Sequence, residues 1–292
     1  MKIAIHLPGG LGDELCLTPT YRALKEKYPH CEITAHVSHP EMLLLNPYVD
    51  HLSNCNRNFY AVNELKKYDR YIYMFWQSNK RQAFSYMHLC DWFASQADVV
   101  LKDRSLILNL GDSDRGFLKD FNFPKNRPIV TFDAYGNKTP NKWSFKSFIK
   151  TIDYLHEKYN AFVIQIGLQD YNIKNADLNL VRRLNIRQLA AMIEYSNLYI
   201  GNDSGAAHIA SAVRTTSVKI FGCTDPARYT HNENEYPVVS DIECQGCQNK
   251  KPCQNPIHKK SVLCPFEQFG CIKIPVEKVF EKIDLAIEKD GK

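Results

Sequence analysis

The sequence lacks the features that mark membrane, fibrous or disordered chains. It has no apolar run near the ~18 residues that would span a bilayer. It has only 13 Gly and 14 Pro among 292 residues, which excludes a collagen-like or low-complexity chain. The apolar fraction of 44% and the charged fraction of 24% are those of a folded globular protein. The length suggests about two domains.

The N-terminus also lacks a secretory signal. A short strand-like run reaches Pro8, Gly9 and Gly10 too early for a signal-peptide core, so we expect a cytoplasmic protein. The net charge of +5 makes the protein mildly basic. This charge would suit an anionic substrate or an anionic membrane surface, but alone it does not identify a partner. No zinc-finger, homeodomain or RNA-binding signature is present, so we expect no nucleic-acid partner.

Hydrophobic patterning predicts strands and helices that alternate along the chain. Strands are expected at 3–7, 33–37, 71–76, 129–132, 161–166, 198–200 and 217–221, and helices at 14–28, 84–97, 145–159, 186–195, 206–213 and 275–288. This order predicts an α/β protein with parallel sheets. A break near 121–128 divides it into two Rossmann-like domains facing each other, 1–125 and 126–292. A single larger doubly wound sheet is the alternative.

A glycine-rich loop, PGGLGD at 8–13, separates the first predicted strand from the first predicted helix. Its spacing is neither G-x-G-x-x-G nor that of a P-loop. Glycines allow a tight turn and close approach to a ligand, and the helix N-terminus that follows offers N–H groups to an anion. Gly10 and Gly12 are therefore candidate ligand-binding residues. The alternative is a simple turn with Asp13 as the N-cap.

Two more small-residue loops follow strands in the C-terminal half. In GNDSGAAH at 201–208, Asp203, Ser204, Gly205 and His208 would leave room for a diphosphate at a helix N-terminus. A plain helix cap and an ordinary buried histidine are the alternatives. In FGCTDP at 221–226, Thr224 and the loop N–H groups would bind phosphate, or Asp225 would only open a turn. Ligand-friendly loops at several strand ends predict a binding site at that sheet edge.

Ten cysteines are present, and five of them cluster near the C-terminus. The cluster consists of Cys244, Cys247, Cys253, Cys264 and Cys271. Its opening C-x2-C is a metal-knuckle spacing, and four thiolates would suit tetrahedral zinc or iron. Without a secretory signal, such clustering favours metal binding or reduced thiols over disulfides. Reduced structural cysteines remain the alternative, and His258 is a weaker ligand candidate.

Taken together, these stretches resemble glycosyltransferase family 9, the lipopolysaccharide heptosyltransferases. The segments that carry the resemblance are GLGD at 10–13 with TPTYRALK at 18–25, RQLAAMI at 187–193, GNDSG at 201–205 with HIA at 208–210, FGCTDP at 221–226, and IPVEKV at 274–279 after the cysteines. They occur in both halves and in the family's order. Residues 45–125 carry no motif that we can place.

The resemblance implies a GT-B fold, with the active site in the cleft between an acceptor-side domain and a nucleotide-sugar domain. It implies inverting transfer of a sugar from a nucleotide diphosphate, usually ADP-heptose, to a glycan or glycolipid such as lipopolysaccharide core, without a catalytic metal. Asp13 matches the family's catalytic base. The implied donor-binding set is Gly10, Gly12, Lys142, Asp203, Ser204, Gly205, His208, Thr224 and Asp225.

Three further hypotheses remain open beside a glycosyltransferase that acts on a glycan. The acceptor could be a protein, or the chain could be a non-catalytic nucleotide-sugar binding protein on the same fold. The third is a metal-dependent assembly module built on the cysteines. For the enzyme we expect a cytoplasmic location, with a peripheral contact at the inner membrane as a further option.

The sequence departs from the family pattern at two places. The family's phosphate-binding lysine stands as K-x-W, whereas here Asn141 occupies that position in PNKW at 140–143, so Lys142, or less favourably Lys138, would replace it. The first loop has Pro8, Gly9 and Gly10 where relatives more often have polar residues, and the chain is shorter than is usual.

The family's tail spacing implies which cysteines would hold a structural zinc or iron. They are Cys244, Cys247, Cys253 and Cys271, and Cys264 resembles an insertion. Some relatives that glycosylate proteins carry an iron-binding cysteine finger.

Overall fold

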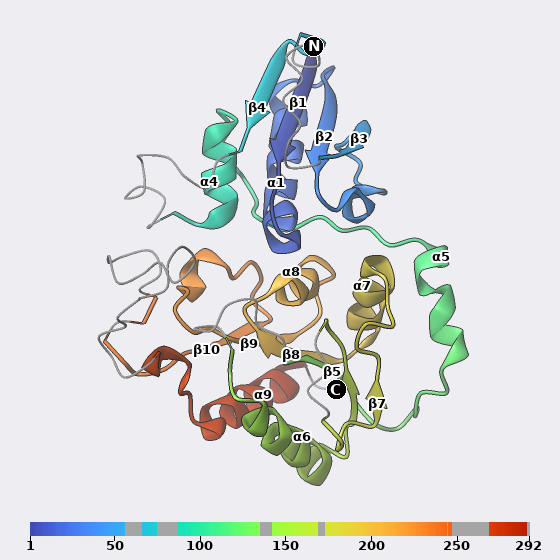
Figure 1. The fold of residues 1–292 in the computed structure, drawn as a ribbon, viewed down its shortest axis with the longest axis vertical. Helices are drawn as coiled ribbons and strands as arrows, with labels where there is room; N and C mark the ends of the chain where they lie inside the picture. The colour runs from blue at the N-terminus through green and yellow to red at the C-terminus, as the bar shows by residue number, and fades with distance from the viewer. Residues whose placement is uncertain are drawn as a thin grey trace. The chain divides into compact units, whose positions relative to one another are not determined.

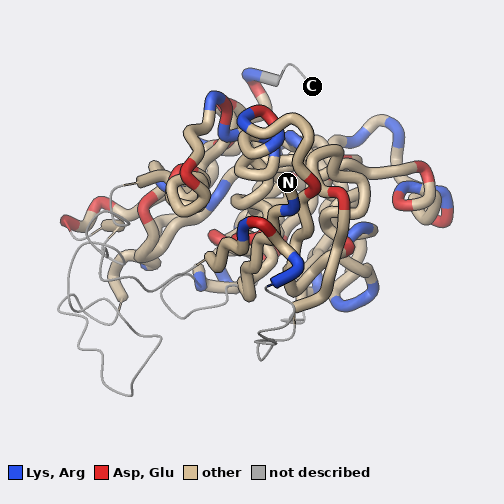
Figure 2. The backbone as a smooth tube through the Cα atoms, turned by 90° about the horizontal axis from the view of Figure 1, so that it is seen from above, with Lys and Arg blue, Asp and Glu red and all other residues tan. Residues whose placement is uncertain are grey.

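The structure is a computed structural model that describes residues 1–55, 66–74, 87–134, 142–168, 173–243, 245–246 and 269–290. The chain divides into two compact units, Met1–Gly111 and Asp112–Lys292. Each unit has its own parallel sheet (Figure 1), so the alternative of one large sheet is wrong. Within the described ranges no helix is long and apolar enough to cross a membrane. Lys and Arg are interspersed with Asp and Glu along the described backbone (Figure 2).

The first unit is a four-stranded sheet in the order β3-β2-β1-β4, with every pair parallel. Its elements are β1 (Lys2–Leu7), α1 (Leu11–Lys27), β2 (Glu32–Val37), η1 (Pro40–Leu43), β3 (His51–Asn54), β4 (Arg70–Tyr73) and α4 (Leu89–Gln96). The apolar side chains of β1 are fully buried, and α1 packs against α4.

Helix α1 contains a proline, and a neighbouring hydroxyl compensates for it. Pro19 has no N–H, so it cannot donate to the carbonyl of Leu15 one turn earlier. The Thr18 hydroxyl donates to that carbonyl instead, at 2.7 Å. The helix therefore continues through Pro19 to Lys27.

The predicted helix at 84–97 is shorter among the described residues. It begins at Leu89, because the His88 ring Nδ1 accepts the Cys90 N–H at 3.2 Å and caps the helix there. Residues 84–86 lie outside the described ranges.

The second unit is a six-stranded sheet in the order β10-β9-β8-β5-β6-β7, again with parallel pairs. Its elements are α5 (Asp112–Arg115), η2 (Gly116–Asp120), β5 (Ile129–Asp133), α6 (Phe145–Tyr159), β6 (Phe162–Gln165), β7 (Leu178–Asn179), α7 (Ile186–Tyr195), β8 (Leu198–Asn202), α8 (Gly205–Ala212), β9 (Ser217–Ile220), η4 (Pro226–Arg228), β10 (Glu235–Val238), η7 (Gly270–Ile272) and α9 (Val276–Asp290). Helices α6 and α9 lie on one face of this sheet and α7 and α8 on the other (Figure 1).

The second unit begins before residue 126, at α5. Asp114 accepts two hydrogen bonds from the Arg187 guanidinium, at 2.7 and 2.5 Å. Arg115 donates two to the Glu194 carboxylate, at 2.6 and 2.8 Å. Bidentate pairs of this kind are the strong form of ion pair, so they fasten α5 to α7 within the second unit.

Candidate functional site

The glycine-rich loop of the first unit leads into α1, and Asp13 lies in the first turn of that helix. Gly10 precedes the helix in an extended conformation, and its N–H donates to Asp13 Oδ2 at 3.0 Å. Gly9 packs closely, because an added Cβ there would lie 3.1 Å from Asp13 Cβ. Gly12 belongs to the same turn. A partly exposed carboxylate is thus fixed beside the carboxyl end of β1.

The adjacent carboxylate, Glu14, has different surroundings. Its side chain is 0% exposed. It accepts the N–H groups of Ser38 at 2.7 Å and His39 at 3.0 Å, and the His39 ring Nδ1 lies 3.1 Å from Oε2. The hydrogen bond to Glu14 is the main cause that raises the pKa of His39 above its ordinary value. Glu14 therefore ties α1 to the segment after β2.

In the second unit, the predicted donor loops follow strands that are neighbours in the sheet. Strands β9, β8 and β5 lie side by side and parallel, so their carboxyl ends meet at one edge. The fully buried Asn202 links two of these ends. Its Oδ1 accepts the Trp143 N–H at 3.1 Å and its Nδ2 donates to the Ala134 carbonyl at 3.0 Å. Lys142, which is exposed and precedes Trp143, is therefore held at this edge.

The end of β8 permits only glycine at position 201. A Cβ there would lie 2.3 Å from the Tyr199 hydroxyl oxygen and 3.1 Å from the Asp133 carbonyl oxygen. Burial is the main cause that raises the pKa of Tyr199 well above its ordinary value. Tyr199 is thus a neutral phenol that fills the space beneath the turn.

The turn after β8 places four predicted residues together. Asp203 precedes Ser204, the extended N-cap residue of α8, and Gly205 begins the helix. On the next turn His208 is buried, with Nε2 at 3.9 Å from Asp203 Oδ1 and Nδ1 at 3.3 Å from His231 Nε2. The imidazole is therefore held between a carboxylate and a second imidazole, beside the helix N-terminus.

The loop after β9 contains an unpartnered buried hydroxyl. Thr224 is 3% exposed, and its Oγ1 has no hydrogen-bond partner among the residues that the structure describes. Leaving a buried donor or acceptor unsatisfied costs about 1–3 kcal/mol, so this hydroxyl is a candidate to hydrogen-bond a ligand. Asp225 Oδ1 accepts the Ala227 N–H at 3.1 Å and caps η4.

A buried ion pair supports these loops from beneath. Lys219 Nζ lies 2.7 Å from Glu235 Oε2 and 2.5 Å from Ser211 Oγ, and the two charged side chains are 2% and 0% exposed. Glu235 Oε2 also accepts the His231 N–H at 3.1 Å. The pair joins β9, β10 and α8, and it fixes the histidine that contacts His208.

The predicted site residues therefore form two groups, one in each unit. Gly10, Gly12 and Asp13 belong to the first unit. Seven others share the carboxyl edge of β5, β8 and β9 in the second unit, namely Lys142, Asp203, Ser204, Gly205, His208, Thr224 and Asp225. Of the predicted metal ligands, Cys244, Cys247 and Cys253 lie outside the described residues, whereas Cys271 is buried in η7.

Three residues at the second group were missed by sequence reasoning. His231 contacts His208, and Gln245 donates to the backbone of the loop after β9. Arg228 is 2% exposed, and burial is the main cause that lowers the pKa of its guanidinium. Gln245 lies inside the C-x2-C pair at 244–247, which was interpreted only through its thiols, and His231 and Arg228 belong to no recognised motif. Arg228, two residues after the Asp-Pro pair, is the one that its position could have suggested.

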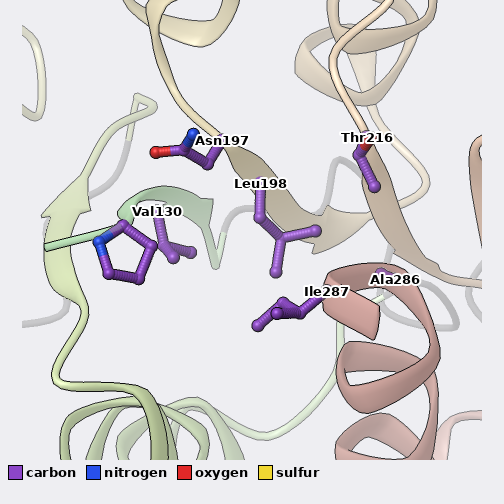
Figure 3. A pocket seen from close by; sticks show the side chains of 7 residues that line it. Val130, Asn197, Leu198, Thr216, Ala286 and Ile287 are labelled. Carbon is purple, nitrogen blue, oxygen red and sulfur yellow. The ribbon is translucent and has the colours of Figure 1, made fainter. Parts of the chain in front are cut away.

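A small apolar pocket lies at the opposite edge of the second sheet (Figure 3). It is formed where β5, β8 and β9 begin and where α9 approaches its end, by Pro128, Val130, Asn197, Leu198, Thr216, Ala286 and Ile287. No predicted site residue lines it. The pocket is therefore separate from the donor loops.

Comparison with known proteins identifies a family. The profile of glycosyltransferase family 9 (heptosyltransferase) matches residues 70–258. A lipooligosaccharide heptosyltransferase 2 of Campylobacter jejuni is 24% identical, over 97% of this chain and 98% of that protein. A lipopolysaccharide heptosyltransferase 3 of Escherichia coli K12 is 30% identical over 28% of this chain and 27% of its own length.

Solved structures show the same fold. The ADP-heptose lipopolysaccharide heptosyltransferase II of E. coli matches with a TM-score of 0.73, at 14% identity, over 100% of both chains. The iron-containing dodecameric glycosyltransferase TibC of enterotoxigenic E. coli matches with a TM-score of 0.74, at 16% identity, over 98% of this chain and 78% of TibC. The predicted GT-B class of α/β fold is thereby confirmed.

Proposed function

The chain belongs to glycosyltransferase family 9 and is a glycosyltransferase, and we propose that it transfers a heptose from ADP-heptose to a glycan acceptor such as lipopolysaccharide core. The observation that carries this proposal is that β5, β8 and β9 end side by side at one sheet edge, where the loop after β9 contains the Thr224 hydroxyl, buried and unpartnered among the described residues. A TibC structure contains ADP-D-β-D-heptose, which supports a donor of this class.

In this proposal the second unit binds the donor. The α8 N-terminus at Ser204 and Gly205 directs backbone N–H groups and a positive dipole towards the diphosphate. Thr224 supplies a hydroxyl. His208, held by Asp203 and His231, lies where it would contact the donor. These groups stabilise the charge that develops on the leaving diphosphate.

Asp13 is the proposed base. The acceptor hydroxyl oxygen forms a bond to the anomeric carbon while the bond from that carbon to the diphosphate oxygen breaks, so the sugar inverts. The hydroxyl proton passes to the Asp13 carboxylate. The Gly10 N–H donates to Asp13 Oδ2 at 3.0 Å and holds the carboxylate in place.

Lys142 is proposed as the replacement for the family's displaced lysine. Its backbone is fixed through the hydrogen bond from Trp143 to Asn202, while its side chain is exposed. An exposed ammonium at this edge can reach a diphosphate from the solvent side. The residue at the family position, Asn141, lies outside the described residues.

The proposed location follows from the acceptor. A lipopolysaccharide-type acceptor is a glycolipid, so a cytoplasmic enzyme would meet it through a peripheral contact at the inner membrane. A protein acceptor is the second candidate. The cysteine cluster supports a bound metal ion, because TibC, which shares the fold, contains iron. We propose Cys244, Cys247, Cys253 and Cys271 as the ligands of one structural zinc or iron ion, with no catalytic metal.

A binding panel tests the donor half of this proposal. ADP, UDP and GDP are titrated into the purified full chain by calorimetry, with thermal shift as the second readout. We expect ADP to bind and to raise the melting temperature most, because ligands that bind only the folded state stabilise it. Absence of binding for all three nucleotides would contradict the donor site.

A further inference from the structure

We infer, on the basis of the donor site proposed above, that Gln245 is a positioning residue for the loop 221–225. Its side-chain amide holds carbonyl groups on one side of the loop, so that loop N–H groups face the diphosphate of the donor on the other side. Gln245 lies between the two cysteines of the C-x2-C pair at 244–247, where the sequence analysis considered only the thiols, and it is one of the few described residues between β10 and η7.

The contacts of Gln245 concentrate on this loop. Its Nε2 donates to the Gly222 carbonyl at 2.6 Å and to the Thr224 carbonyl at 3.3 Å, and it lies 3.5 Å from the Phe221 carbonyl oxygen. At the other end of the amide, Oε1 accepts the Ser240 hydroxyl at 2.9 Å. Ser240 is itself buried. One side chain thus connects the segment after β10 with the loop after β9.

The surroundings fix which way the amide points. The group that faces the loop meets only carbonyl oxygens, which accept and cannot donate, so it must be the NH2 group. The group that faces Ser240 meets a hydroxyl, which donates to the amide oxygen. A glutamate in this place would present two acceptors to the carbonyls and could not make the same contacts.

The peptide geometry then orients the N–H groups of the loop. In a trans peptide the carbonyl of one residue and the N–H of the next point in opposite directions. Holding the Gly222 and Thr224 carbonyls towards Gln245 therefore turns the N–H groups of Cys223 and Asp225 to the opposite side. Backbone N–H groups that point to one side of a turn offer hydrogen-bond donors to an anion.

Two further features connect this orientation with the ligand. The buried Thr224 hydroxyl, unpartnered within the described ranges, belongs to the same loop. Gly246, in the left-handed region at φ +73°, packs so closely on Asp225 that a Cβ would lie 3.1 Å from Asp225 Cβ. Residues 245 and 246 together therefore support both Thr224 and Asp225 from the side away from the proposed donor.

ADP affinity and hydrogen exchange together test this inference. Calorimetry with ADP compares the wild-type full chain with Gln245→Ala, Gln245→Glu and Ser240→Ala. The matched control is Gln96→Ala in the first unit, whose amide donates to the Trp92 carbonyl at 3.4 Å. We expect the Kd for ADP to rise about tenfold in both Gln245 variants and about threefold in Ser240→Ala, with less than about a twofold change in the control.

Steady-state kinetics and hydrogen exchange distinguish positioning of the loop from a purely structural role of Gln245. We expect the KM for the nucleotide sugar to rise in Gln245→Ala while kcat stays within about twofold, and hydrogen exchange of 221–228 to accelerate in the free protein. Unchanged ADP affinity in Gln245→Glu and Ser240→Ala would overturn the inference. This test remains valid even if Gln245→Ala does not fold. If wild-type protein binds no nucleotide, the proposed donor fails, and unchanged exchange of 221–228 in the variants would separately refute positioning by Gln245.

Discussion

Asp13 and Glu14 are adjacent carboxylates, and their different contacts indicate different roles. Asp13 is partly exposed and fixed by the Gly10 N–H, whereas Glu14 is buried and accepts hydrogen bonds from Ser38 and His39. We expect Asp13→Ala to lower kcat by a factor of ~10²–10⁴, the usual contribution of a general base. The Kd for ADP should stay within a few fold, because the base acts on the acceptor. Near-normal turnover of the purified, folded variant would refute the assignment.

The contact between His39 and Glu14 makes stability depend on pH. The pKa of His39 is raised above 6.5 in the folded chain, mainly by the hydrogen bond to Glu14. The stabilisation is therefore complete below the unfolded pKa and is lost as the pH rises through the folded pKa. We expect wild type to exceed His39→Gln in free energy of unfolding most below about pH 6, with the difference shrinking towards about pH 8. Urea denaturation at both pH values checks this; a constant or growing difference would contradict it.

A Lys142→Ala variant tests whether Lys142 replaces the family's phosphate-binding lysine, whose position Asn141 occupies. We expect Lys142→Ala to raise the Kd for ADP by about three- to tenfold, because the variant loses one charged contact to the diphosphate. The matched control is Lys146→Ala, another exposed lysine, in the first turn of α6. Equal ADP affinity in wild type and Lys142→Ala, measured by calorimetry, would show that Lys142 is only a surface charge.

Among the helices and strands, the hydrophobic pattern predicts an element correctly where that element's own residues show a clear periodicity. The amphipathic helices α6 and α7 are found with the predicted bounds, and α9 begins within one residue of its prediction. The edge strands β3 and β10 were missed, because β3 has no buried face and β10 contains Pro237. Such strands can be assigned to a sheet edge only once the strand order is known, because an edge strand has one neighbour and can accommodate a proline.

The cysteine segment is the element whose proposed role can be tested by composition. Purified without added metal, the chain should contain close to one zinc or iron ion, measured by elemental analysis. We expect Cys247→Ser to lose the ion and to melt at a lower temperature, because metal binding contributes to folding of the segment that it closes. Cys264→Ser is the matched control and should keep the ion. Fully stable, metal-free wild type would instead favour reduced thiols.

At the scale of the whole molecule, motif recognition located most of the candidate donor site but not its supports. Thr224, Asp203 and His208 were predicted because they belong to small-residue motifs that follow predicted strands. His231 and Gln245 were not, because their contacts join segments that approach only after folding. The start of the second unit at α5 depends likewise on ion pairs with α7, whose partners lie 73 and 79 residues later in the sequence.

Coupled product analysis tests the central claim, heptosyl transfer, most directly. The purified full chain is incubated with ADP-heptose and a heptose-deficient lipopolysaccharide core, and ADP release and acceptor mass are followed together. We expect one ADP for each heptose residue gained by the acceptor, and both products to form ~10²–10⁴-fold more slowly with Asp13→Ala. Donor binding without any mass gain, on a glycan or on a protein acceptor tested in parallel, would contradict the account.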